Sequence, residues 1–562
     1  MARVSPFAAA AALLSAIALA AATRPEPVGA LSSQPPPNLV VFMTDDQTVE
    51  SLRVMPNVRR LLAREGTTFE NAFASFPVCC PSRATFLTGQ YAHNHGVMSN
   101  HPPRGGSQKL DHLNTLGLWL QAAGYRTVHL GKYLNGYGRD ISPLVPGAWS
   151  EWYGSLDPST YNFVDYDLME NGRRVRYGPS VTMYQTDVYG RKGADFVRRL
   201  AGRPQPFFLF VGFLAPHVGR PVDPDDPARY TTPSPAPRHR DAFASEPLPR
   251  PPSFNELDVS DKPPGVRRRP RLSRAHAADL RELYQQRLES LLAVDEAIAR
   301  VVAELRRTRT LGRTLIVFTS DNGFMHGEHR IPQGKVVAYE PSARVPLILR
   351  GPGVPRNRVQ RDLVTNVDIA PTLLEAAGAD ATRLLDGRSL LPLAADPGRR
   401  LGRDVLLESG VYSGIRTHRF KYVQYVGGAR ELYDLQRDPH ELQSRHRDPA
   451  LAGIRDELAR RLRLLRTCFG ESCSVAPRVR LAVAGGESCV TTDAAARVEG
   501  DVRRLATAEF RLAGRRLRVV RRGPYSARVP AAQLGPRNQL LRVRLRYRDG
   551  RELTVDRLLR RC

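Results

Sequence analysis

The chain reads NLVVFMTDDQ from Asn38 to Gln47. The first seven of these residues are almost uninterruptedly apolar, as in a strand that is buried on both faces of a parallel sheet. The run ends abruptly at Asp45 and Asp46, so two carboxylates are predicted at the carboxyl end of this strand. In parallel α/β sheets, ligands bind outside that end of the strands.

Other apolar runs repeat this pattern. Strands are predicted over 125–130, 207–213 and 314–319, and a long amphipathic helix over 277–307. Apolar strands that alternate with helices predict a mostly parallel α/β sheet flanked by helices. We expect its carboxyl edge to collect the polar residues that follow the strands: Asp45, Asp46, Lys132, His217, Asp321 and Asn322.

The stretch from Cys79 to Gly89 reads CCPSRATFLTG. Proline suits the first helical position, so a helix is predicted over 81–89, with Cys79 just ahead of its N-terminus. Such a terminus presents unpaired N–H groups and favours an anion beside residue 79. Arg83 adds a planar guanidinium one turn later.

Two further helices are predicted early in the chain. One covers 57–65 and ends at Gly66, and the other extends to residue 123 with Asn114 as its N-cap.

Composition changes divide the chain into five parts. Residues 1–22 resemble a secretory signal peptide, too short and alanine-rich to span a membrane, and 23–37 form a Pro/Ser linker. The α/β domain covers 38–395, with an irregular Pro/Arg-rich insertion at 219–273. A small antiparallel α+β subdomain covers 396–467, and an Arg-rich β-sandwich covers 475–562, with Asp549-Gly550 as a hairpin turn.

We therefore expect an exported protein, secreted, extracellular or at the cell surface, without a stable membrane span. Four late cysteines fit two disulfides in an oxidising compartment, and Cys468–Cys473 with Cys489–Cys562 is the simplest of three connectivities. Cys79 and Cys80 remain outside this set.

The chain is strongly basic, with a formal net charge of +27 over 562 residues. Residues 475–562 contain 21 arginines, no lysine and only 8 acidic residues. A basic surface can bind nucleic acid, an anionic membrane or an acidic substrate such as a sulfated glycan. We expect no nucleic-acid partner, and we hypothesise that the C-terminal module holds a polyanionic substrate. An arginine-rich genome would produce the same composition, so charge alone leaves both explanations open.

The carboxylates and amide oxygen of Asp45, Asp46, Asp321 and Asn322 are hard ligands. They suit Ca²⁺, with Mg²⁺ as the alternative, better than a softer metal.

The run CCPSRATFLTG closely resembles the signature of the type I sulfatases, in the alkaline phosphatase-like superfamily. DDQ, GKY, APH, SDNG and the lysine before VPLILRGPG follow in that family's order, over roughly residues 38–440. The N-acetylglucosamine-6-sulfatase branch is the most similar, through PNLVVFMTDDQ, CCPSR with HNHGV, and GKYLNGYG.

This resemblance implies that a formylglycine-generating enzyme oxidises Cys79 to Cα-formylglycine. The hydrated aldehyde would attack sulfur through one oxygen and expel sulfate through the other. Residue 79 would join the four oxygen ligands around the cation. Arg83 would steady the hydrate, Lys132 and Lys335 would bind sulfate oxygens, and His217 would donate to the leaving oxygen.

The chain departs from the family at one position. Many sulfatases have a histidine two residues after the lysine that matches Lys132, and this chain has Leu134. The base that releases sulfate is therefore expected elsewhere, at His329 or at a hydrated neighbour of Asn135.

The leading hypothesis is an exported sulfatase that acts on a 6-O-sulfated amino sugar of glycosaminoglycan type. Two alternatives stay open: a phosphate or phosphonate ester hydrolase of the same superfamily, and a non-catalytic binder of anionic glycans.

Overall fold

A computed structural model of the protein describes residues 35–139, 147–223, 226–474, 479–484, 489–536, 538–548 and 550–562. All elements discussed below belong to the compact unit Pro36–Cys562. The predicted signal peptide, most of the linker, and Asp549 of the predicted hairpin turn lie outside the described residues.

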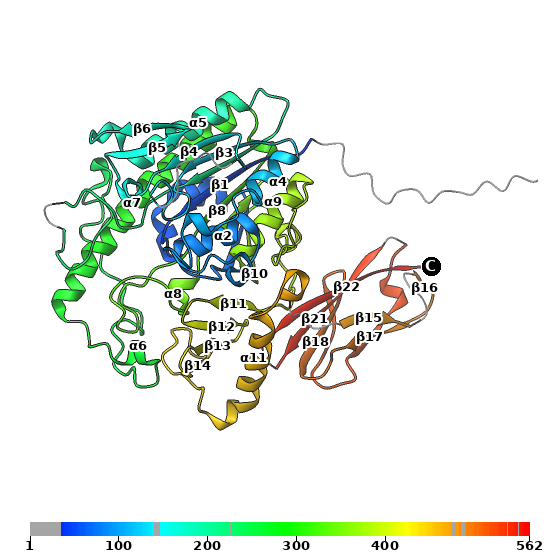
Figure 1. The fold of residues 1–562 in the computed structure, drawn as a ribbon. Helices are drawn as coiled ribbons and strands as arrows, with labels where there is room; N and C mark the ends of the chain where they lie inside the picture. The colour runs from blue at the N-terminus through cyan, green and yellow to red at the C-terminus, as the bar shows by residue number, and fades with distance from the viewer. Residues whose placement is uncertain are drawn as a thin grey trace, which may run out of the picture. The chain divides into compact units, whose positions relative to one another are not determined.

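A ten-stranded mixed sheet forms the centre of the α/β part (Figure 1). Strand β1 (Asn38–Thr44) lies between β8 (Thr314–Ser320) and β7 (Phe207–Gly212), and both neighbours run parallel to it. Strand β3 (Arg126–Gly131) continues the parallel core beside β7. The outer strands are β2 (Thr67–Phe73), β9 (Leu347–Arg350), β10 (Arg358–Thr365), β4 (Glu151–Ser155), β5 (Tyr166–Glu170) and β6 (Arg173–Tyr177).

The apolar run of β1 is buried throughout, as predicted for a strand covered on both faces. Val40 and Phe42 point to one side, where α5 (Gln185–Leu200) and α7 (Arg274–Arg307) pack. Leu39 and Val41 point to the other, where α2 (Cys79–Thr88), α4 (Leu116–Ala122) and α9 (Ile369–Ala377) pack. The α/β fold with helices on both faces of the sheet is thus confirmed.

Some sequence-based boundaries are wrong for local reasons. Helix α2 begins at Cys79, two residues earlier than predicted, because Val78 is extended and its carbonyl already accepts the N–H of Ser82 at 2.9 Å. Cys79 therefore lies in the first helical turn rather than ahead of it.

Asn114 does not cap α4. Thr115 occupies the N-cap position without a side-chain hydrogen bond, and Asn114 Oδ1 instead accepts the indole N–H of Trp119 at 2.9 Å. The helix predicted over 57–65 is a short α-turn (Pro56–Val58) followed by a π-turn (Arg59–Ala63).

The outer part of the sheet departs from parallel order. Strand β9 runs antiparallel to both β8 and β2, and β4, β5 and β6 pair as antiparallel neighbours. The described residues of 219–273 are mostly irregular, apart from a 3₁₀ turn (Pro237–His239) and the short helix α6 (Pro264–Arg267). Among the described residues, no helix combines the length and apolar character that a membrane crossing requires.

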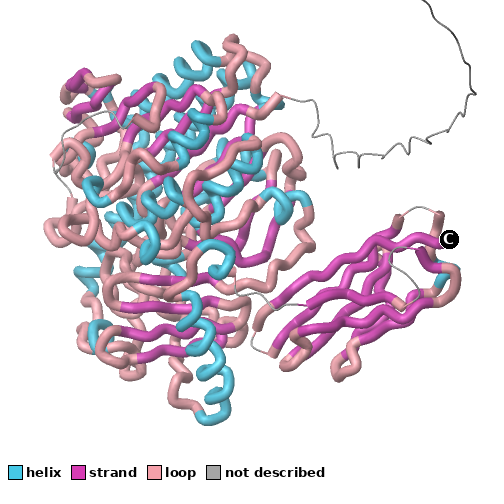
Figure 2. Tube along the Cα trace, turned by 45° about the vertical axis from the view of Figure 1, so that its right-hand side comes forward, coloured by secondary structure: helices cyan, strands magenta, loops and turns pink. Residues whose placement is uncertain are grey.

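Two smaller, mainly antiparallel parts follow (Figure 2). The first is a four-stranded sheet, β11 (Val405–Glu408), β12 (Tyr412–Arg416), β13 (Phe420–Tyr425) and β14 (Arg430–Asp434), against which α11 (Ala452–Leu465) packs. The second is a sandwich around one apolar core. Its three-stranded sheet holds β15 (Val479–Val483), β17 (Ala494–Gly500) and β20 (Ser526–Val529). Its other sheet holds β16 (Cys489–Val490), β18 (Leu505–Leu512), β19 (Arg515–Val520), β21 (Gln539–Tyr547) and β22 (Glu552–Arg561), with β16 and β22 as a parallel pair.

Cys468 and Cys473 form a disulfide, one pair of the simplest connectivity. The expected pairing of Cys489 with Cys562 involves the Cys489 side chain, which lies outside the described part of the structure. Cys79 and Cys80 are free and buried.

Candidate active site

Three carboxylates meet where β1 and β8 end. The two strands are in register, with Thr44 opposite Ser320, so the acidic residues that follow them are neighbours. The N–H of Asp46 donates to Asp321 Oδ1 at 3.1 Å. Asn322 Nδ2 donates to Asp46 Oδ1 at 2.6 Å. Asp46 has a φ of 67°, a left-handed conformation that non-glycine residues adopt mainly where surrounding structure imposes it.

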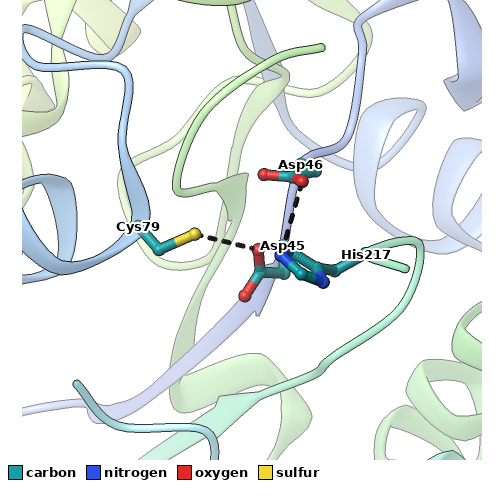
Figure 3. Close-up of side chains that lie close together, drawn as sticks. All are labelled: Asp45, Asp46, Cys79 and His217. Atoms are coloured by element: carbon teal, nitrogen blue, oxygen red, sulfur yellow. Dashed lines mark hydrogen bonds and ion pairs between the residues drawn. The ribbon is translucent and has the colours of Figure 1, made fainter. Parts of the chain in front are cut away.

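Cys79 reaches this group from the first turn of α2. Its Sγ lies 3.4 Å from Asp45 Oδ1. Figure 3 shows Cys79, Asp45, Asp46 and His217 converging from three different segments. One ligand-type atom from each of these four residues lies within 4.8 Å of the other three. The structure thus brings the predicted nucleophile position to the predicted cation ligands.

Three buried cations surround the carboxylates. Arg83 spans two of them, with Nε 2.7 Å from Asp321 Oδ2 and Nη2 3.2 Å from Asp45 Oδ2. Lys132 pairs with Asp45, and Lys335 pairs with Asp46. The Lys335 ammonium also lies 3.0 Å from Cys79 Sγ. All nine residues predicted for the site therefore lie in one connected cluster.

Burial and charge act on the titration of these groups in different directions. Burial alone would raise the pKa of Asp45, but Lys132, His217 and Arg83 hold it well below its ordinary value. Burial, with the negative charge of Asp45, raises the pKa of Asp321 to about 6. Burial also raises the pKa of the Cys79 thiol. An unmodified Cys79 would therefore be a neutral thiol at neutral pH, a weaker nucleophile than a thiolate.

His217 presents a lone pair to the cluster. Its Nδ1 lies 2.7 Å from the Val218 carbonyl oxygen, which can only accept, so the proton of the neutral ring resides on Nδ1. Its Nε2 lies 3.8 Å from Asp46 Oδ2. Burial lowers the pKa of His217 to about 4, despite the nearby carboxylates. His217 can thus donate a proton from Nε2 only after Nε2 has first accepted one.

The donor set fits a hard divalent cation. Three carboxylates and one amide converge, and the side-chain oxygen of Asn322 is buried without a hydrogen-bond partner among the described residues. A buried carbonyl-type oxygen without a partner is costly unless it coordinates an ion or a water. The chemistry of these donors matches Ca²⁺ or Mg²⁺ better than a thiolate-seeking metal.

Sequence reasoning missed two residues that support the site. The ring of Tyr161 lies 4.8 Å from Lys132 Nζ, and its hydroxyl accepts a hydrogen bond from Asn135 Nδ2 at 2.6 Å. Arg287 donates to the backbone carbonyls of Asp46 and Pro216. A buried arginine within the apolar pattern of a long helix was the available signal for Arg287. No motif marked Tyr161.

None of the three positions considered for sulfate release, Leu134, His329 and Asn135, belongs to the cluster of nine site residues. Leu134 belongs to the apolar core on the α2 side of the sheet. His329 is 1% exposed, lies 2.6 Å from Glu256 Oε2 and stacks on Tyr339. Within the described chain, His329 has no contact with Cys79, so its proposed part in sulfate release is not supported. The side chain of Asn135 donates from Nδ2 to the Tyr161 hydroxyl at 2.6 Å.

Comparisons with known proteins agree on one family. The sulfatase family profile matches residues 37–379, and a profile described as N-sulphoglucosamine sulphohydrolase, C-terminal, matches residues 327–467. Human N-acetylglucosamine-6-sulfatase is 31% identical over 492 residues, covering 78% of this chain and 86% of that protein.

An extracellular sulfatase Sulf-1 homologue of Caenorhabditis elegans is 36% identical over 403 residues, covering 69% of this chain. This chain spans only 54% of the length of that relative. The solved structure of BT4656, in complex with its substrate D-glucosamine-2-N,6-O-disulfate, aligns with a TM-score of 0.63 and 25% identity. The alignment covers 76% of this chain and 97% of that one.

Proposed function

The chain belongs to the sulfatase family. From this premise we propose that it is an exported enzyme that hydrolyses sulfate esters. In this proposal the reaction uses a formylglycine at residue 79 and a divalent cation. One observation supports this most: Cys79 lies between Asp45 Oδ1 at 3.4 Å and the Lys335 ammonium at 3.0 Å. Its Sγ marks where the oxygens of a hydrated aldehyde would lie, between a group that binds cations and groups that bind anions.

Each part of the site has a chemical task in this proposal. A hydrated aldehyde at residue 79 would supply one oxygen that attacks sulfur and a second that expels the sulfate. A divalent cation held by Asp45, Asp46, Asp321, Asn322 and residue 79 would polarise the sulfate oxygens. Lys132 and Lys335 bind the sulfate oxygens, and Arg83 holds Asp45 and Asp321 in position and adds positive charge.

His217 moves the proton. Its neutral Nε2 accepts a proton from the attacking hydroxyl and then donates it to the leaving alcohol oxygen, so the S–O bond to the alcohol breaks without releasing an alkoxide. The same nitrogen, neutral again, can accept the proton of the second hydroxyl as the C–O bond to sulfate breaks and the aldehyde forms. Addition of one water to the aldehyde and loss of the His217 proton to solvent would then restore the hydrate and the neutral ring. This cycle would replace the base that Leu134 cannot provide.

For the substrate, we infer a 6-O-sulfated N-acetylglucosamine or a related sulfated glycan. Relatives named N-acetylglucosamine-6-sulfatase, and a neighbour bound to a 6-O-sulfated glucosamine, support this class. Calcium is the preferred cation, a formylglycine-generating enzyme is the maturation partner, and export relies on the predicted signal peptide at residues 1–22.

The test combines a mass measurement with an assay. Native exported protein should contain a Cys79 peptide whose mass matches an aldehyde, and should release sulfate from a 6-sulfated sugar. Cys79→Ala should abolish that release. Equal release by the variant would refute the mechanism, and an intact cysteine in native protein without turnover would favour the non-catalytic glycan binder. Faster turnover of aryl phosphate than of aryl sulfate would favour the phosphoester alternative.

A further inference from the structure

A second cationic cavity lies beside the small antiparallel sheet. It has a volume of about 420 Å³ and is bordered by Arg104, by the β12–β13 hairpin and by the end of α11. Three arginines line it: Arg104 from the loop after α3 (Ala92–His95), Arg430 at the start of β14, and Arg466 after α11. We refer to it as the three-arginine cavity.

The three guanidinium groups are exposed and carry uncompensated charge. None of them forms an ion pair with a carboxylate within the described ranges, whereas the nearby Arg460 and Arg461 pair with Glu457 and Asp404. Three like charges that line one cavity repel each other, and an anion in the cavity would relieve this repulsion.

Neutral hydrogen-bond donors also line the cavity. Ser409 Oγ accepts the backbone N–H groups of Val411 and Tyr412 at 3.1 and 3.2 Å, so those bonds leave its hydroxyl proton available to an anion. The side chains of Ser413 and Gln424 add further polar atoms. A planar guanidinium and a hydroxyl are both groups that bind sulfate or carboxylate oxygens.

Short connections join this cavity to the catalytic segment. Asn100 Oδ1 accepts the N–H of Cys80 at 2.9 Å, and Arg104 follows four residues later, a reach of at most about 14 Å of extended chain. Ser409, which also lines the cavity, follows Glu408, whose N–H donates to the Ser75 carbonyl at 2.8 Å. Arg104 and Ser409 are thus both connected to residues 75–80.

We propose that the three-arginine cavity binds a second anionic group, a sulfate or carboxylate, of the same glycan chain whose 6-sulfate lies at Cys79. The preferred substrate is then a polyanionic oligosaccharide rather than a single sulfated sugar. This inference rests on the proposed sulfatase function. It assigns polyanion binding to a cavity whose lining is connected to the catalytic segment 75–80, whereas the sequence-based hypothesis assigned it to the C-terminal sandwich.

The test uses a variant with three substitutions, Arg104→Gln, Arg430→Gln and Arg466→Gln, in the full chain. A matched control removes the same charge from the sandwich through Arg515→Gln, Arg516→Gln and Arg522→Gln, which are exposed and have no carboxylate partner in the described structure. Each protein is assayed on a 6-O-sulfated N-acetylglucosamine monosaccharide and on a hexasaccharide with additional sulfate and carboxylate groups.

The cavity variant should raise KM for the hexasaccharide about tenfold or more, with kcat unchanged and monosaccharide turnover unchanged. The control should leave both substrates unaffected, and the wild-type preference for the hexasaccharide should weaken as salt increases. Unchanged monosaccharide turnover also shows that the cavity variant is folded.

Equal KM values for the hexasaccharide in wild-type protein and the cavity variant would overturn the proposal. So would loss of hexasaccharide affinity in the control alone. If wild-type protein releases sulfate from neither substrate, the proposed sulfatase function is wrong. Binding of the hexasaccharide to wild-type protein and to the cavity variant, measured by calorimetry, then tests the cavity on its own. Equal affinities refute anion binding in the cavity, and weaker binding by the cavity variant supports it.

Discussion

Replacing Lys335 tests whether the cations around residue 79 act on the reaction. The Lys335 ammonium lies 3.0 Å from Cys79 Sγ and pairs with Asp46, and its side chain is 13% exposed. Removing one preorganised donor from a site of developing charge costs about 10²–10³ in kcat, or ~2.7–4 kcal/mol. Lys335→Ala should therefore lower kcat on an aryl sulfate by about 10² or more.

The assay must separate chemistry from maturation and folding. Sulfate release is measured under single-turnover conditions and divided by the formylglycine content of each preparation, determined by mass spectrometry. Lys192→Ala serves as the control, because Lys192 pairs with Glu170 away from the site. That control should keep wild-type turnover.

Lys335→Arg adds a second comparison. It keeps the positive charge but replaces a compact ammonium with a planar guanidinium, so it should recover only part of the lost rate. If Lys335→Ala lowers kcat by less than about fivefold at equal formylglycine content, Lys335 does not stabilise the transition state. In that case the ammonium would serve only to neutralise Asp46.

Three other perturbations follow from the structure. Tyr161→Phe should keep most of the activity, whereas Tyr161→Leu should lower kcat about tenfold. The reason is that the ring lies 4.8 Å from Lys132 Nζ, and a cation–π contact contributes ~0.5–2 kcal/mol. Equal rates in the two variants would exclude this role of the ring. Treatment with EDTA should abolish sulfate release and lower the Tm, and Ca²⁺ should restore both; full activity in protein verified as metal-free would contradict the cation proposal. Burial raises the pKa of Glu289 to about 7 from an ordinary 4.5, so its contribution to stability is full below about pH 4.5 and is lost as the pH rises through 7. The free energy of unfolding, measured with denaturant, should therefore rise on Glu289→Gln substitution by ~1–3 kcal/mol more at pH 8 than at pH 4. An equal effect of the substitution at both pH values would show that ionisation of Glu289 is not the cause.

The central fold and the candidate site could be predicted because both depend on short-range patterns. The apolar run Asn38–Thr44 required a strand covered on both faces, and the polar residues after each such strand had to share one edge of the sheet. The antiparallel additions could not be predicted in the same way. Strand β9 has only four residues, and its direction depends on pairing with strands far away in the sequence.

Three local features of this chain differ from what its sequence signals predict. Asn114 is a favourable capping residue, but the indole N–H of Trp119 uses its side-chain oxygen. Pro81 suits a helix start, but extended Val78 lets the helix begin at Cys79. Tyr161 could not be found from the sequence, because it reaches Lys132 from a 3₁₀ turn (Ser159–Tyr161) that no motif identifies.

The charge balance of the site links cation binding to sulfate binding. Three carboxylates and three cationic side chains pair with one another almost without solvent, so these six charges cancel: Asp45, Asp46, Asp321, Arg83, Lys132 and Lys335. The buried Arg287, which donates to the Asp46 carbonyl, adds a further positive charge. A buried cluster so nearly balanced has little net attraction for a sulfate ester, which carries a negative charge. A divalent cation would add two positive charges, and in a buried site this excess is poorly screened. It would also compete for the carboxylate oxygens that now pair with Lys132 and Lys335, which frees both ammonium groups to bind an anion. Binding of the cation should therefore precede and strengthen binding of the sulfate.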